Sequence, residues 1–194
     1  WSQRPTKDVA DGVARALHDG NVEAALDDVV AGRCMVGVMG GHAIGRGSEE
    51  YAAAARLGRG LARAGYTVGT GGGPGAMEAA NLGSYLAAAP DDALDEALEL
   101  LAAVPSFRPS VAAWAERAFE VRERWPGGDG GIGVPTWFYG HEPPNVFAGA
   151  IAKFFQNSVR EATLLQRCNG GIVFLGGAAG TVQGAQHPHL APGE

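Results

Sequence analysis

The sequence has few cysteines, no long apolar run and no cluster of positive charge. Its two cysteines, Cys34 and Cys168, have neither the density of a disulfide framework nor metal-ligand spacing, so we expect buried, reduced thiols. No apolar stretch approaches the roughly 18 residues that cross a bilayer. The first residues also lack the apolar core of a signal peptide. We therefore predict no membrane partner and a cytoplasmic location.

Positive charge is scarce relative to negative charge. There are 15 Lys and Arg against 21 Asp and Glu, which gives a net charge of −6. Without a basic run, the chain lacks the main electrostatic driving force for binding nucleic acid, and no nucleic-acid partner is expected. The 46% hydrophobic and 19% charged residues exclude a disordered chain and favour one globular domain with a sizeable core.

Short apolar runs alternate with longer amphipathic patterns along most of the chain. The runs CMVGVMGG, YTVGTGGG, IGVPTWFY and GIVFL predict strands, with Pro135 placing the third in an irregular or edge position. Helices are predicted over 6–18, 21–31, 48–64, from Pro74 onward, and over 91–103, 110–125 and 143–168. This order predicts an α/β fold, a three-layer Rossmann-like doubly wound parallel sheet. We expect accessory helices in 1–31, a nucleotide-binding domain in 32–183 and a divergent, disordered tail in 184–194.

Glycine-rich turns follow three of the predicted strands. They begin at Gly40-Gly41-His42, at Gly71 and at Gly176. Glycine lets a backbone approach a ligand closely, and free N–H groups at a helix start favour an anion, so a phosphate suits the turn that precedes Pro74. An ordinary tight turn is an equally good interpretation of that composition. In a parallel sheet the three turns would meet in one crevice. The turn at Gly71 fits the dinucleotide fingerprint poorly and no Walker A loop is present, so neither NAD nor ATP is indicated.

Polar residues recur at helical spacing in the last predicted helix. Lys153, Asn157, Arg160 and Glu161 would share one face of it, for which a solvated surface is the simpler interpretation. His187 and His189 lack a third ligand, so no metal site is predicted. The aromatic residues Trp114, Trp125 and Trp137 are expected in the core or at an interface.

Four segments together resemble a known family. MGGHAIGRGSEEY, GTGGGPGAMEAANLG, EPPNVFAGAIAKFFQNSVREATL and GIVFLGGAAGT look like the LONELY GUY (LOG)-type phosphoribohydrolases, formerly mislabelled as lysine decarboxylases. The resemblance spans about 34–181 and is strongest to the longer bacterial branch, which includes the pyrimidine/purine nucleotide 5′-monophosphate nucleosidases. It implies a homodimer that needs no metal or cofactor. It also implies hydrolysis of a nucleoside 5′-monophosphate such as AMP to free base and ribose 5-phosphate.

The resemblance also implies roles for individual residues. Arg160 would act as the catalytic arginine that contacts phosphate or ribose, whereas Glu161 stands where the short branch usually has lysine. The phosphate and nucleotide would be bound by Gly40, Gly41, His42, Gly71, Gly72, Gly73, Pro74, Gly75, Ala76, Met77, Asn157, Gly176, Gly177, Gly180 and Thr181.

The second glycine motif departs from the family pattern. Leu175 replaces a proline, one extra residue precedes Gly180-Thr181, and Gly184 stands where the family has a glutamate that acts on the glycosidic bond. Glycine supplies neither charge nor a proton acceptor, and Pro188 and Pro192 would break the following helix. We therefore expect a chain truncated at its C-terminal side relative to the family, with impaired nucleosidase activity. The alternatives are a non-catalytic nucleotide- or phosphate-binding protein and an inactive fragment whose tail results from a frame change.

Overall fold

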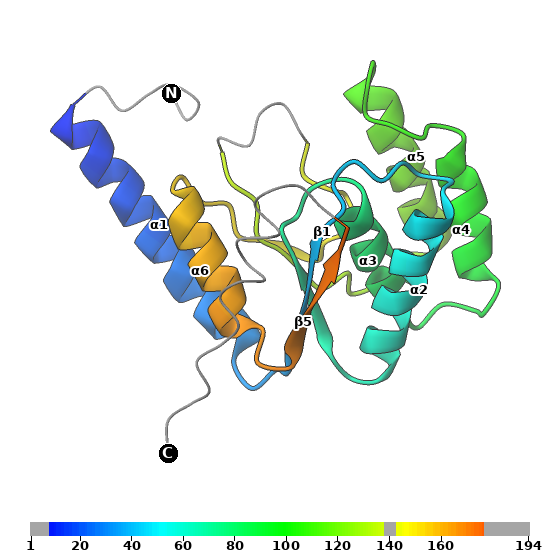
Figure 1. Ribbon diagram of the computed structural model, residues 1–194, viewed down its shortest axis with the longest axis horizontal. Helices are drawn as coiled ribbons and strands as arrows, with labels where there is room; N and C mark the ends of the chain where they lie inside the picture. Colours follow the sequence, from blue (N-terminus) through cyan, green and yellow to red (C-terminus); the bar gives the residue numbers. More distant parts are fainter. Residues whose placement is uncertain (1–7, 138–142, 177–194) are drawn as a thin grey trace.

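The computed structural model describes residues 8–137 and 143–176 (Figure 1). Within these residues no helix is long and apolar enough to cross a membrane. The helices are α1 (Val9–Val30), α2 (Glu49–Arg63), α3 (Ala76–Tyr85), α4 (Ala93–Ala102), α5 (Val111–Arg124) and α6 (Asn157–Arg167). The strands are β1 (Met35–Gly40), β2 (Thr67–Thr70), β3 (Ile132–Gly133), β4 (Ala150–Ile151) and β5 (Gly171–Leu175).

The five strands form one parallel sheet in the order β4-β3-β2-β1-β5. The chain leaves β1 through α2 to pair β2 on one side, and later returns through α6 to pair β5 on the other side. Because parallel crossovers are right-handed, these opposite directions place the two helices on opposite faces. Figure 1 shows α1 and α6 on one face of the sheet and α2 to α5 on the other. The predicted three-layer Rossmann-like α/β fold is confirmed.

Both faces of the sheet are buried, which explains why its strands contain apolar runs instead of an alternating pattern. On one face Met35 packs in a cluster with Leu26 of α1 and Leu164 of α6. On the other face Val38 packs with Val68 and Ala80 of α3. A further cluster joins α2, α3, α4 and α5.

Two glycines let α2 and α3 pack backbone against backbone. A β-carbon on Gly83 would lie 2.7 Å from the Arg59 nitrogen and 2.8 Å from the Ala55 carbonyl carbon. One on Gly58 would lie 2.8 Å from the α-carbon of Ala80. Real β-carbons do not approach other atoms this closely, so the separation of the two helices requires glycine at both positions.

The N-terminal region forms one helix, α1, where the sequence predicted two separated at Gly20. Asp8 caps the helix start by accepting a hydrogen bond from the Asp11 N–H at 2.8 Å. The helix continues through Gly20 because α1 is tied to α6 next to it: buried Asp19 accepts N–H bonds from Phe155 (2.8 Å) and Gln156 (3.0 Å). An interior glycine costs only about 1 kcal/mol of helix stability, which such contacts can offset.

The predicted long helix over 143–168 is wrong in its first half. Asn145 Oδ1 accepts bonds from the Phe147 and Ala148 N–H groups, which holds a turn, and the chain then runs extended through β4. Helix α6 begins only at Asn157. Strand β4 was missed because it is two residues long and because Ala148, Ala150 and Ala152, in and around it, favour helix locally. It forms because β3 supplies a partner, and the pairing continues past Pro135 as a bridge between Thr136 and Phe154.

Only one cysteine matches the expectation for thiols. Both are free, but Cys34 is exposed and Cys168 is buried beneath the sheet. Burial disfavours the thiolate and raises the pKa of Cys168 to about 12.

Candidate functional site

Three glycine-containing turns lie together at the carboxyl ends of β1, β2 and β5. The Ala76 N–H donates to the Gly41 carbonyl at 3.0 Å, which joins the first turn to the start of α3. A β-carbon on Gly41 would lie 2.6 Å from that of Ala76 and 3.7 Å from the Gly176 carbonyl oxygen. The turns therefore meet where β1 separates β2 from β5, the position at which open parallel sheets bind ligands.

Gly75 is the residue that allows the first two turns to meet. Its φ of 74° lies in the left-handed region, which side chains other than glycine rarely adopt. A β-carbon there would also lie 2.8 Å from the His42 carbonyl oxygen and collide with that of Gly41. Gly75 is the N-cap residue of α3 and provides no side-chain cap. The first N–H groups of α3 thus begin beside the Gly41 turn, with the positive end of the helix dipole at the crevice.

Arg160 brings a positive charge to the same place. It lies in the first turns of α6 and is 8% exposed. Its Nη1 lies 3.6 Å from the position that a β-carbon on Gly71 would occupy. Its Nη2 donates to Asn157 Oδ1 at 2.8 Å and lies 3.9 Å from Glu161 Oε1. The guanidinium is therefore held against the glycine turn by its own helix.

Lys153 does not share the helix face that the sequence predicted for it. It lies in the extended segment after β4, and its Nζ is 4.0 Å from the centre of the Trp137 ring. Partial burial lowers the pKa of this lysine. Only Asn157, Arg160 and Glu161 of the four predicted residues form one group on α6.

Three buried polar side chains that sequence reasoning missed hold the glycine turn from behind. Thr70 Oγ1 donates to Asn81 Oδ1 at 2.7 Å and accepts the Gly72 N–H at 3.0 Å. Asn145 Nδ2 donates to the Gly73 carbonyl at 3.2 Å and to Asn81 Oδ1 at 3.0 Å. The signal in the sequence is weak: Asn81 is one of several polar residues in α3, beside Glu78 and Ser84, and Asn145 was interpreted as part of a helix start.

A buried ion pair supports the loop that follows the first turn. Arg46 donates to Glu78 through Nε (3.1 Å) and Nη2 (2.5 Å), and both side chains are 1% exposed. Arg46 also donates to the Trp114 carbonyl at 2.8 Å and stacks 4.4 Å from the centre of that ring. Burial raises the pKa of Glu78, while Arg46 opposes the rise. Burial beside Glu78 also raises the pKa of the Tyr51 hydroxyl.

These contacts define what the site can do. The first turn of α3, the Gly71–Gly75 turn and the Arg160 fork together present donors and positive charge to an oxyanion. Glu78 is committed to Arg46 and is not free to act on a ligand. Among residues 8–137 and 143–176 no three His, Cys, Asp or Glu side chains gather closely enough to hold a metal ion.

The remaining predicted residues are divided between this site and the undescribed part of the chain. Gly40 is the last residue of β1, and His42, two residues later, is half-buried. Pro74 is buried, and Met77 Sδ lies against Gly71. The predicted residues Gly177, Gly180 and Thr181, and the position of Gly184, lie outside the described residues.

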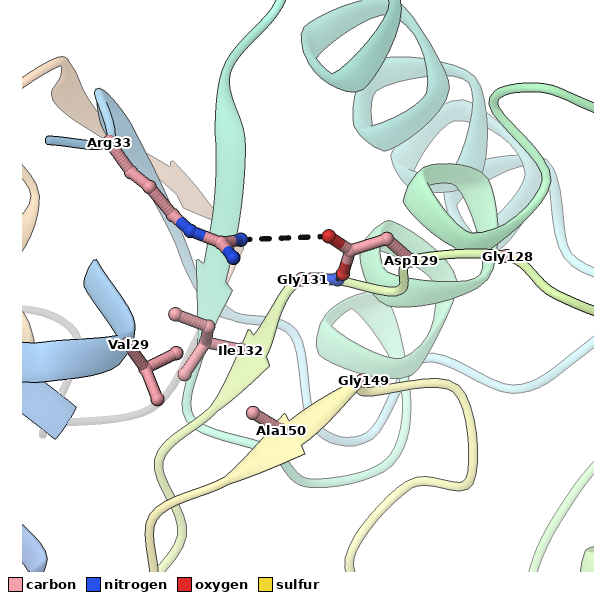
Figure 2. Close-up of a pocket in the computed structure, with 8 residues that line it drawn as sticks. All are labelled: Val29, Arg33, Gly128, Asp129, Gly131, Ile132, Gly149 and Ala150. Atoms are coloured by element: carbon pink, nitrogen blue, oxygen red, sulfur yellow. Dashed lines mark hydrogen bonds and ion pairs between the residues drawn. The ribbon is translucent and has the colours of Figure 1, made fainter. Parts of the chain in front are cut away.

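A pocket of about 270 Å³ lies at the opposite edge of the sheet, near the amino ends of the strands. Its lining residues are Val29, Arg33, Gly128, Asp129, Gly131, Ile132, Gly149 and Ala150. Figure 2 shows Arg33 and Asp129 pointing toward one another, 3.6 Å apart, and both side chains are exposed. An exposed ion pair of this kind contributes little energy, and none of the predicted site residues lines this pocket.

No protein-family model matches the chain, and no curated protein matches it significantly.

Proposed function

We propose that this protein binds a nucleoside 5′-monophosphate, with the 5′-phosphate in the crevice between the Gly71–Gly75 turn, the start of α3 and Arg160. The observation that carries the proposal is the position of the Arg160 guanidinium beside Gly71, at the point where three glycine turns meet. A guanidinium fork and backbone N–H groups are the donors that proteins use for phosphate. AMP is the first ligand to test.

We further propose that the bound nucleotide is hydrolysed at its N-glycosidic bond. This part is supported by the resemblance of the two glycine motifs and the α6 segment to LOG-type phosphoribohydrolases. Water would attack the anomeric carbon as the bond to the base breaks, and the base would leave with a proton, giving ribose 5-phosphate. Arg160 would hold the phosphoribosyl group while positive charge develops on the sugar. The expected homodimer and cytoplasmic location remain predictions.

The second candidate function is nucleotide binding without turnover. It is favoured by Gly184, which stands at the motif position of the family's glutamate. Loss of this carboxylate removes a group that acts on the glycosidic bond but leaves the phosphate-binding turn unchanged. The binding half of the proposal is shared by both candidates, and they differ only in whether free base is released.

Calorimetry with AMP and ribose 5-phosphate, combined with chromatographic detection of adenine, tests the proposal. We expect both ligands to bind, and adenine release above the uncatalysed rate identifies the hydrolase. Binding without release identifies the second candidate, whereas no binding of either ligand refutes both.

A matched pair of variants on α6 tests the role of Arg160. Arg160→Gln removes the charge beside Gly71 and is expected to weaken ribose 5-phosphate binding by about tenfold or more. Arg167→Gln is the control, because Arg167 lies at the other end of α6 and pairs with Glu23 and Asp27 of α1. Equal affinities of the two variants would refute the assignment of Arg160 to the site.

A further inference from the structure

The buried amide of Asn145 uses all of its hydrogen-bonding groups. Its two Nδ2 protons go to the Gly73 carbonyl and to Asn81 Oδ1, and its Oδ1 accepts the N–H groups of Phe147 and Ala148, both at 3.1 Å. Its own backbone N–H donates to the Gly72 carbonyl at 2.8 Å. Asn145 is 1% exposed and Asn81 is fully buried, so water does not compete for these bonds.

These bonds fix the orientation of two successive peptide groups in the glycine turn. The Asn145 backbone N–H holds the Gly72-Gly73 peptide through the Gly72 carbonyl, and the Asn145 side chain holds the Gly73-Pro74 peptide through the Gly73 carbonyl. The Gly72 and Gly73 carbonyls both face Asn145. In a trans peptide the N–H points away from the carbonyl of the preceding residue, so the Gly73 N–H faces away from Asn145. Among the described residues the Gly73 N–H finds no hydrogen-bond acceptor. The same turn lies against the Arg160 guanidinium at Gly71, two residues before Gly73.

We propose that Asn145 is a positioning residue that turns the Gly72-Gly73 peptide so that the Gly73 N–H donates to the bound phosphate. Asn81 supports it: Asn81 accepts from both Thr70 and Asn145, and its Nδ2 is anchored on the Gly130 carbonyl at 2.6 Å. The side-chain bonds of Asn145 anchor the Gly73 carbonyl and hold the turn from which the Asn145 backbone N–H reaches Gly72. Glycine has wide conformational freedom, so without these side-chain bonds the Gly72-Gly73 peptide could rotate and present its carbonyl to the anion instead. The proposal rests on the proposed function, because it assumes a phosphate in this crevice.

Two substitutions of Asn145 separate its positioning role from effects of added charge and from a failure to fold. Asn145→Ala is neutral and removes every side-chain bond. Asn145→Asp keeps the oxygen that accepts from Phe147 and Ala148, and so preserves the local turn, but it loses the donors to Gly73 and Asn81. This variant serves as the test if the alanine variant does not fold. The matched control is Asn169→Ala. Asn169 also bridges backbone groups, accepting from the Met35 N–H and donating to the Arg33 carbonyl, but it does so at the amino end of β1.

The experiment measures ribose 5-phosphate affinity by calorimetry and the Gly73 amide resonance of the ligand-free proteins by ¹H–¹⁵N NMR. We expect both Asn145 variants to bind about tenfold or more weakly and to shift the Gly73 resonance. Asn169→Ala should bind within about twofold of the wild type, with Gly73 unshifted, even where its melting temperature falls equally. A folded Asn145 variant with wild-type affinity, or with an unchanged Gly73 resonance, overturns the proposal.

The two proposals fail in different ways. If the wild type does not bind ribose 5-phosphate, the proposed function fails, and the Gly73 resonance of the ligand-free variants still decides whether Asn145 orients the turn. If the wild type binds and both Asn145 variants bind equally well, only the positioning role fails.

Discussion

Replacing Arg46 with methionine is expected to destabilise the protein strongly and in a pH-dependent way. The substitution leaves Glu78 buried without its ion-pair partner. Breaking a buried pair by removing one member costs about 3–5 kcal/mol at a pH where the remaining group is charged. A part of this loss does not depend on pH, because Arg46 also stacks on Trp114 and donates to its carbonyl.

The pH dependence follows from the direction of the Glu78 shift. Burial already raises the pKa of folded Glu78 above its unfolded value, and the charge and hydrogen bonds of Arg46 hold it down. Without Arg46 the folded pKa rises further, so the native variant takes up a proton at higher pH than the unfolded chain does. Between the two pKa values, stability falls by up to about 1.4 kcal/mol for each unit of rising pH. The loss of unfolding free energy in Arg46→Met, relative to the wild type, is therefore largest at pH 8 and becomes smaller as the pH is lowered.

Urea unfolding followed by circular dichroism at pH 5 to 8 measures this deficit. The double variant Arg46→Met/Glu78→Leu removes the unpaired carboxylate and should recover much of the lost free energy of unfolding. Its free energy of unfolding should no longer show the pH dependence that Glu78 contributes. Arg117→Gln is the control. Arg117 pairs with Glu120 on the surface, where both side chains are nearly half exposed, and its loss should cost less than about 1 kcal/mol.

Two results would contradict this account. One is a deficit of Arg46→Met that is the same at pH 5 and pH 8. The other is a double variant that is no more stable than Arg46→Met alone.

Three further predictions concern stability and thiol reactivity. Asp19→Ala leaves two backbone N–H groups at the start of α6 without their acceptor, and urea unfolding should show a loss of about 1–2 kcal/mol. Gly83→Ala forces α2 and α3 apart and should lower the free energy of unfolding by about 1–3 kcal/mol. Gly60 lies in α2, but a β-carbon there meets nothing within 4 Å, so Gly60→Ala should raise the free energy of unfolding by about 0.5–1 kcal/mol. Changes of the same sign in the two variants would contradict this packing argument. Alkylation followed by mass spectrometry at pH 8 should label Cys34 and spare Cys168 until the protein is unfolded.

The sequence predicted well the parts of the fold that local signals determine. Ser48 caps α2 where the pattern places it, and the predicted GIVFL strand is β5. Glycine turns after three strands also led directly to the crevice, because the carboxyl ends of parallel strands lie along one edge.

The parts that were wrong depend on partners distant in sequence. The segment before Asn157 is rich in alanine and large apolar residues, which local propensity assigns to a helix. Its extended conformation requires β3 beside it and the Asn145 turn before it. Likewise, the continuity of α1 through Gly20 depends on Asp19 bonding to Phe155, just before α6 and 136 residues away along the chain. Single-sequence patterns contain no record of such pairs.

The polar residues behind the glycine turn were missed for a related reason. Thr70, Asn81 and Asn145 come from β2, α3 and a turn before β4, and each one alone is an ordinary polar residue. Their common purpose is visible only once the fold brings their bonds together on the same turn. Buried hydrogen-bonding networks of this kind are thus harder to predict than the glycines that they hold.

The carboxylate of Asp19 makes the N-termini of α3 and α6 differ in how readily they can bind an anionic ligand. It accepts the Phe155 and Gln156 N–H groups immediately before α6, so an internal anion already lies beside the positive pole of that helix. The N-cap residue of α3, Gly75, has no such side chain. An incoming phosphate therefore meets an attached carboxylate at the start of α6, whereas at the start of α3 it meets no carboxylate and finds the Ala76 N–H already bonded to the Gly41 carbonyl. The two helices therefore contribute differently: α3 offers backbone N–H groups, and α6, with an internal carboxylate beside its N-terminus, offers the side chain of Arg160.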